Sequence, residues 1–100
     1  MIIRSKAPLR LGLAGGGTDV SPYSDMFGGL VLNATINLYT HCTIEETNDG
    51  MITIKSFDAM VDKLYHATKY LDLDGEAILV KGVYNRIMKD YDLEALSFKI

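Results

Sequence analysis

A chain of 100 residues holds one domain at most, and domains of this size bury enough surface to fold. With 48% hydrophobic and 23% charged residues, the composition is that of a soluble globular protein. The net charge of −3 and the lack of a basic block argue against nucleic acid as a partner. No apolar run reaches membrane-spanning length, no signal peptide is evident, and the single cysteine allows no internal disulfide, so we expect a cytoplasmic protein without a membrane partner.

The first elements predicted are a strand and a short helix, separated by glycines. Residues 2–14 have the apolar composition of a strand, and Pro8 predicts an edge position or a bulge. After the glycines, Asp19 is predicted to cap a helix over residues 21–27. The glycine pair at residues 28–29 is expected to end that helix.

The middle of the chain is predicted to be extended. Residues 30–46 are rich in Val, Ile, Thr and Tyr, which favours a long strand. The Asn-Asp-Gly sequence at residues 48–50 is a hairpin signal that leads into an alternating strand at residues 51–57. Residues 60–66 are ambiguous, with a further edge strand as one interpretation.

An amphipathic helix is predicted after Asp74 and Gly75, and an alternating strand pattern begins at Leu96. The side chains predicted to face the core from this helix are Leu79, Val80, Val83, Tyr84, Ile87 and Met88. Those predicted to face away from the core are Lys81, Asn85 and Lys89.

The sequence APLRLGLAGGGTD at residues 7–19 is the strongest functional signal. Glycines without Cβ atoms allow positive φ and a close approach of the backbone to a ligand. Their N–H groups, together with a helix N-terminus, attract anions or sugar oxygens. A tight strand-to-helix turn is the alternative interpretation, but the flanking polar residues favour a ligand site. The predicted substrate-binding residues are Gly15, Gly16, Gly17, Thr18 and Asp19.

Arg10 is the candidate catalytic residue. It lies in an apolar stretch, where a charge is costly unless it is paired. One interpretation is therefore a structural ion pair at a sheet edge, and the other is a role in chemistry. Asp19 likewise has two compatible interpretations, as a helix cap and as an acceptor of hydrogen bonds from vicinal hydroxyls.

The segment RSKAPLRLGLAGGGTD, followed by GGLVLNATINLYTHCTI, resembles the small-molecule kinase superfamily of galactokinase, homoserine kinase, mevalonate kinase and phosphomevalonate kinase (the GHMP kinases). Within it, the resemblance is closest to D-glycero-D-manno-heptose phosphate kinases. It is strong over the first half of the chain. It implies an α+β fold with a mixed or antiparallel sheet and helices on one face. It also implies ATP and Mg²⁺, with Arg10 orienting the attacking hydroxyl and stabilising the transferring phosphoryl group.

Two departures from the superfamily pattern refine this expectation. Galactokinases carry Glu-His where Gly16 and Gly17 stand, so the space suits a bulkier or phosphorylated sugar. The second superfamily motif, Pro-x-x-x-Gly-Leu-Gly-Ser-Ser, which holds the triphosphate, does not occur. Residues 1–100 are therefore predicted to be the N-terminal portion of a longer kinase, with ATP and Mg²⁺ bound mainly outside them. Another superfamily sugar kinase, such as a fucose kinase, and a non-catalytic sugar-binding or interaction domain remain alternatives.

No metal site is predicted. His41 and Cys42 are neighbours on a predicted strand, so their side chains face opposite ways, and no ligand cluster surrounds them. His66 is interpreted as an isolated surface or edge residue. The expected partners are a sugar phosphate and ATP, and the pattern does not indicate an oligomeric state.

Overall fold

The computed structural model describes residues 1–100 and divides them into two compact units. One unit comprises Met1–Arg4 together with Cys42–Ile100, and the other comprises Ser5–His41. Two long strands, β1 (Ile2–Ala14) and β2 (Leu32–Glu46), contribute residues to both units.

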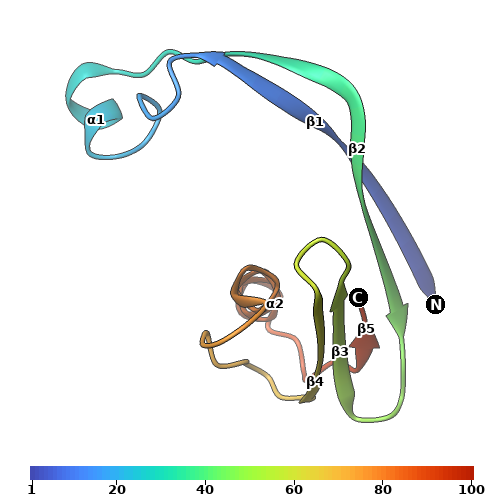
Figure 1. Cartoon of the computed structure of the whole chain (residues 1–100). Helices are drawn as coiled ribbons and strands as arrows, with labels where there is room; N and C mark the ends of the chain where they lie inside the picture. The colour runs from blue at the N-terminus through green and yellow to red at the C-terminus, as the bar shows by residue number, and fades with distance from the viewer. The chain divides into compact units, whose positions relative to one another are not determined.

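Five strands hydrogen-bond in the order β1-β2-β5-β3-β4 (Figure 1). β3 (Met51–Ser56) pairs antiparallel with β4 (Val61–His66). β5 (Phe98–Lys99) pairs antiparallel with the end of β2 and parallel with β3. The sheet is therefore mixed, which confirms the predicted α+β class. β1 and β4 lie at the two edges, where Pro8 and the ambiguous segment were expected to lie.

The predicted turn between β2 and β3 forms, but the predicted hairpin is wrong. Gly50 has φ +71°, and the Asp49 carboxylate accepts hydrogen bonds from the Thr47 hydroxyl at 2.8 Å and the Met51 N–H at 3.0 Å. The Thr47 hydrogen bond, followed by that from Met51, lowers the pKa of Asp49. β5 nevertheless lies between the two strands that this turn connects. A local turn signal carries no information about a strand that arrives from the far end of the sequence.

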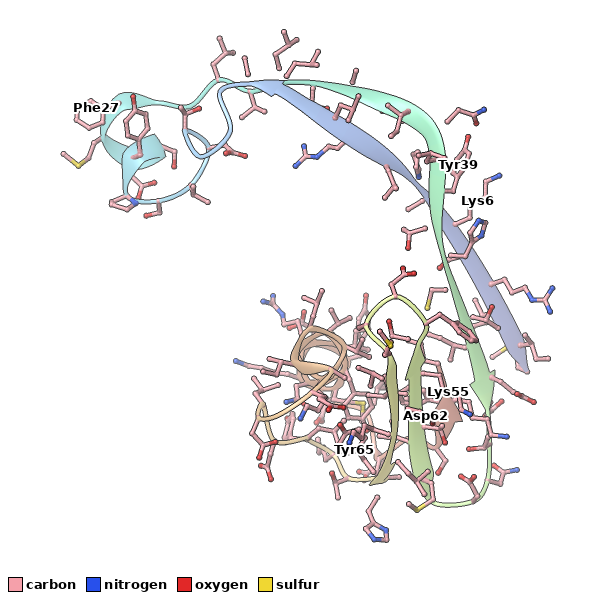
Figure 2. All side chains as sticks on the ribbon, in the orientation of Figure 1. Lys6, Phe27, Tyr39, Lys55, Asp62 and Tyr65 are labelled. Carbon is pink, nitrogen blue, oxygen red and sulfur yellow. The ribbon has the colours of Figure 1, made fainter.

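β3 and β4 pair along their full length in the first unit. Their register places Lys55 opposite Asp62, and the two side chains form an ion pair at 3.1 Å (Figure 2). Both side chains are more than half exposed, so the pair contributes less than about 1 kcal/mol. The register therefore depends mainly on the buried face of β3, where Ile52 and Ile54 are inaccessible to solvent.

The hydrophobic core lies between that face of β3 and α2 (Ile78–Tyr91), which covers one side of this part of the sheet (Figure 1). Tyr84 and Met88 of the helix are buried with the two isoleucines of β3, and Leu71 joins them from the preceding loop. The rings of Tyr84 and Phe98 lie in a tilted arrangement with centroids 5.7 Å apart, so β5 contributes to the same core.

The predicted orientation of α2 is wrong in part. Leu79 is 80% exposed and Val83 is 53% exposed, whereas Lys81 is only 2% exposed. The Lys81 ammonium donates to the backbone carbonyl and the carboxylate of Asp74, and it lies 5.3 Å from the centre of the Tyr65 ring. These partners compensate the buried charge while the aliphatic stem packs in the core.

Asn85 confirms which side of α2 faces the rest of its unit. Its side-chain amide accepts a hydrogen bond from the Leu71 N–H at 2.8 Å and donates to the Leu71 carbonyl at 2.7 Å. The helix has apolar residues on two sides, so periodicity could not choose between them. Two polar side chains with specific backbone partners decided the orientation.

The short helix α1 (Tyr23–Phe27) belongs to the second unit. Its predicted end is confirmed, because Gly28 has φ +73° and its N–H donates to the Ser24 carbonyl at 3.0 Å. The prediction that Asp19 caps it is wrong, since the N-cap is Pro22 and no side chain caps the helix. The helix begins at Tyr23, so Asp19 lies too far before it to cap it. No helix of the structure is long and apolar enough to cross a membrane.

Candidate functional site

Every predicted site residue lies in the unit Ser5–His41. Arg10 is on β1, and the other five residues form the loop that leaves its C-terminal end. This loop approaches the segment between α1 and β2, which places its residues beside Leu30.

Two of the three glycines are required by the backbone. Gly15 has φ +80° and Gly17 has φ +90°, a region that other residues rarely adopt. A Cβ atom on Gly15 would lie 1.9 Å from the Leu30 carbonyl oxygen, well inside contact distance. Gly15 therefore permits the loop to pack against the following segment.

Thr18 connects the two sides of this contact. Its N–H donates to the Gly15 carbonyl at 3.1 Å, and its hydroxyl lies 2.7 Å from the same oxygen. The hydroxyl oxygen also accepts a hydrogen bond from the Leu30 N–H at 3.1 Å. A Cβ atom on Gly29 would lie 2.3 Å from the Thr18 carbonyl oxygen. In this conformation the Thr18 hydroxyl is occupied with holding the loop.

Gly16 and Asp19 differ from their neighbours because neither takes part in a packing contact or a side-chain interaction within the chain. No atom lies within 4 Å of a Cβ built on Gly16, and its φ is outside the left-handed region. Asp19 is exposed and its carboxylate takes part in no hydrogen bond or ion pair. The loop is held in place by Thr18, while Gly16 has open space beside it and the Asp19 carboxylate is free to bind a ligand.

Arg10 is exposed and makes no ion pair, although Lys and Arg side chains elsewhere in the chain do. The structural ion pair considered from the sequence is therefore not formed within this chain. Gly15 follows Arg10 by five residues, directly after β1 ends at Ala14. At about 3.3 Å per residue, their Cα atoms are up to about 16 Å apart. The guanidinium and the loop can hence contact different parts of one elongated ligand.

The structure contains no cluster of metal-ligating side chains. No group of three or more His, Cys, Asp and Glu side chains is placed to hold a metal ion. Cys42 is free and half-buried, while His41 and His66 are exposed. The glycine loop leads into a turn rather than directly into a helix N-terminus.

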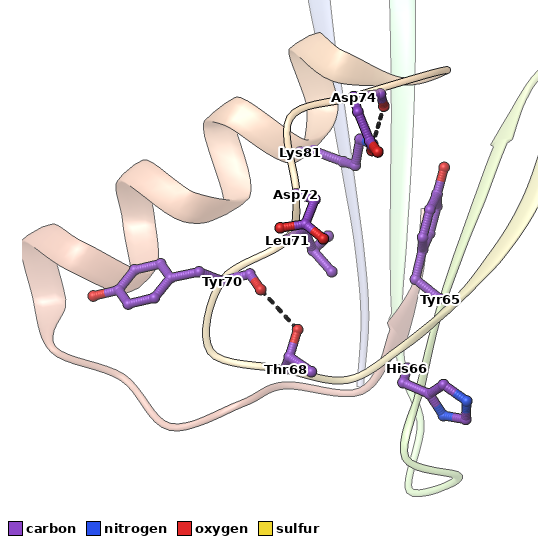
Figure 3. Close-up of a pocket in the computed structure, with 8 residues that line it drawn as sticks. All are labelled: Tyr65, His66, Thr68, Tyr70, Leu71, Asp72, Asp74 and Lys81. Carbon is purple, nitrogen blue, oxygen red and sulfur yellow. Dashed lines mark hydrogen bonds and ion pairs between the residues drawn. The ribbon is translucent and has the colours of Figure 1, made fainter.

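The unit that contains Cys42–Ile100 has a pocket of about 330 Å³ to which the sequence assigned no function (Figure 3). It is lined by Tyr65, His66, Thr68, Tyr70, Leu71, Asp72, Asp74 and Lys81. Its buried ammonium group, on Lys81, is already bound by Asp74. The Thr68 hydroxyl donates to the Tyr70 carbonyl at 2.8 Å. These interactions show that Lys81, Asp74 and Thr68 support the loop before α2.

Comparison with known proteins shows close similarity to heptose phosphate kinases, although no family model matches the chain. The chain is 48% identical over 98 residues to D-glycero-alpha-D-manno-heptose 7-phosphate kinase of Campylobacter jejuni subsp. jejuni serotype O:2, which covers 98% of this chain and 29% of that protein. The crystal structure of a D-glycero-D-manno-heptose 1-phosphate kinase from Bacteroides thetaiotaomicron matches 99% of the chain at 67% identity, with a TM-score of 0.88 and 32% of that protein covered. A putative sugar kinase from Campylobacter jejuni, at 48% identity, matches 98% of the chain and 31% of its own length, with a TM-score of 0.79.

The resemblance predicted from the sequence is thereby confirmed, and membership of the GHMP superfamily is consistent with it. The resemblance extends over the second half of the chain as well as the first. The chain spans about a third of the length of these relatives.

Proposed function

We propose that this chain is the N-terminal, substrate-side portion of an ATP-dependent kinase that phosphorylates a D-glycero-D-manno-heptose phosphate. The observation that carries the proposal is the pair of unpartnered charges, Arg10 and Asp19, on either side of a glycine loop that is fixed in place by Thr18. The similarity to heptose phosphate kinases over nearly the whole chain supports it.

Phosphoryl transfer is accelerated chiefly by positioning and by stabilising negative charge, so the side chains present here have specific tasks. Arg10 would orient the acceptor hydroxyl and donate hydrogen bonds to the transferring phosphoryl oxygens. Asp19, an acceptor-only carboxylate, would accept hydrogen bonds from sugar hydroxyls. Free loop N–H groups near Gly16 would bind the phosphate that the sugar already carries.

Several parts of this proposal lie outside residues 1–100. ATP and Mg²⁺ would be held mainly by residues beyond this chain, because the superfamily's triphosphate-binding motif does not occur among residues 1–100. The low charge and the single cysteine support a cytoplasmic enzyme without a nucleic-acid or membrane partner.

The test is a product assay of the complete protein with ATP, Mg²⁺ and a panel of heptose and hexose phosphates. We expect turnover with D-glycero-D-manno-heptose 7-phosphate at the anomeric hydroxyl, or with the 1-phosphate. Phosphorus NMR of the product distinguishes these two reactions. Preference for fucose would favour the alternative sugar kinase, and binding without turnover would favour a non-catalytic sugar-binding domain.

Gly16→Glu is expected to raise KM for the phosphorylated sugar in the complete protein. The new side chain fills open space and brings negative charge towards the substrate phosphate, and like charges about 4 Å apart near a surface cost about one to a few kcal/mol. Steady-state kinetics should show a KM increase of about tenfold or more. Gly16→Gln is the control that separates size from charge. Equal KM values in Gly16→Glu and the parent would place the sugar phosphate elsewhere.

The isolated segment of residues 1–100 is expected to show no ATP turnover and no tight ATP binding. Catalysis needs the acceptor, the triphosphate and the metal in one geometry, and this segment offers only the acceptor side. Isothermal calorimetry with Mg·ATP checks this, with the complete protein as the positive control. Micromolar affinity of the segment would contradict the proposed division of the site.

A further inference from the structure

β1 and β2 form a two-stranded ribbon in the unit Ser5–His41, and one contact fixes which residues share a face. The Lys6 ammonium lies 4.1 Å from the centre of the Tyr39 ring (Figure 2). These two side chains therefore project from the same face. Since side chains alternate along a strand, even-numbered residues of β1 share this face with odd-numbered residues of β2.

The direction of the strands determines which of these residues are neighbours. The Glu46 N–H at the end of β2 donates to the Met1 carbonyl just before β1, so the two strands run antiparallel. Continued along a regular antiparallel ladder, the Met1–Glu46 pairing brings Asn37 opposite Arg10 on this face, with Thr35 the next residue of β2 on the same face.

The face that carries Arg10 is polar, and the opposite face is apolar. The apolar face is formed by Leu9, Leu11, Leu13, Leu32, Ala34, Ile36 and Leu38. On the polar face, Arg10, Thr35 and Asn37 are all exposed, and none of their side chains forms a hydrogen bond or an ion pair within the chain. A Cβ built on Gly12, the next residue of β1 on this face, would meet no atom within 4 Å.

The Thr35 and Asn37 side chains differ from Arg10 in their hydrogen-bonding chemistry. A hydroxyl and a carboxamide each donate and accept hydrogen bonds, as sugar hydroxyls do. A guanidinium only donates, and it matches phosphoryl oxygens. A guanidinium with neutral donor-acceptor groups beside it suits a phosphoryl group being transferred to one hydroxyl of a polyhydroxylated substrate.

We propose that Asn37 and Thr35 bind the sugar hydroxyls next to the hydroxyl that Arg10 orients. This inference rests on the proposed kinase function and adds two substrate-contacting residues to it. In this arrangement the glycine loop binds one end of the sugar phosphate. Asn37 and Thr35 bind the other end, which carries the reacting hydroxyl.

The experiment compares variants of the complete protein in steady-state kinetics with the heptose phosphate that the parent turns over. Asn37→Ala and Thr35→Val are expected to raise the sugar KM about tenfold and about threefold respectively, with the KM for ATP unchanged. Thr40→Val is the matched control, because Thr40 is exposed on the same strand but belongs to the opposite face. It should leave both KM values unchanged.

A deoxy analogue of the sugar phosphate separates binding from structure. The parent and Asn37→Ala should have equal affinity for the analogue that lacks the contacted hydroxyl. If Asn37 had only a structural role, Asn37→Ala would weaken the binding of the analogue and of the normal sugar phosphate by the same factor. Asn37→Ser repeats the measurement if the alanine variant does not fold. If the parent is active and the Asn37 and Thr35 variants behave like Thr40→Val, the inference is overturned while the kinase function stands. If the parent phosphorylates no sugar phosphate, the proposed function itself is overturned.

Discussion

Arg10→Ala is expected to lower kcat of the complete kinase about a hundredfold or more while changing the sugar KM much less. Arg10 is exposed and makes no ion pair in this chain, so its removal breaks no structural contact seen here. The loss of one charge contact made to the transition state typically has an effect of about this size. Steady-state kinetics with saturating ATP measures both constants.

Arg4→Ala is the matched control, since Arg4 is also an exposed arginine of β1 without an ion pair and has no proposed role in the site. Its kcat should equal that of the parent. Arg10→Lys should recover only part of the lost rate, because a point charge replaces a planar group with a fork of donors. An unchanged kcat in well-folded Arg10→Ala would disprove the catalytic assignment.

Gly15→Ala is expected to destabilise the protein by about 2–5 kcal/mol. The substitution places a Cβ atom 1.9 Å from the Leu30 carbonyl oxygen and forces a residue with a side chain to φ +80°. Positive φ and steric overlap with a backbone group each cost about 1–3 kcal/mol. Denaturant unfolding of the complete protein measures the change.

Gly16→Ala provides the comparison within the same loop. Its new methyl group meets open space and its φ is ordinary, so the free energy of unfolding should stay the same or rise by up to about 1 kcal/mol. Equal destabilisation by both substitutions would show that the contact between the loop and Leu30 does not form. The pair thus separates the glycine that the fold requires from the glycine that only a ligand would require.

The sequence by itself determined most of the secondary structure and the location of the candidate site. Strand composition identified β1, β2 and β3, and the glycine after Phe27 correctly ended α1, because these features depend on residues close together in the sequence. The resemblance carried by residues 7–19 also identified the heptose phosphate kinases to which the whole chain is similar. Such local features do not depend on how the elements pack together.

The errors share a different physical origin. Asp19 does not cap α1 because the helix begins at Tyr23, with Pro22 at the N-cap position. Within the loop, periodicity and composition could not show that Gly15 serves packing while Gly16 faces open space. The role of Gly15 depends on its contact with Leu30, a residue outside the loop.

Only the tertiary structure decided which strand lies beside which and which side of α2 is buried. β5 enters between β2 and β3 because its backbone groups pair with both, a choice made by hydrogen bonds between residues far apart in sequence. Lys81 became a core residue because Asp74 and Tyr65 compensate its charge, whereas the more hydrophobic Leu79 stayed exposed. Local sequence specifies the elements, but the free energy of burying a polar group depends on the partners that only the assembled fold supplies.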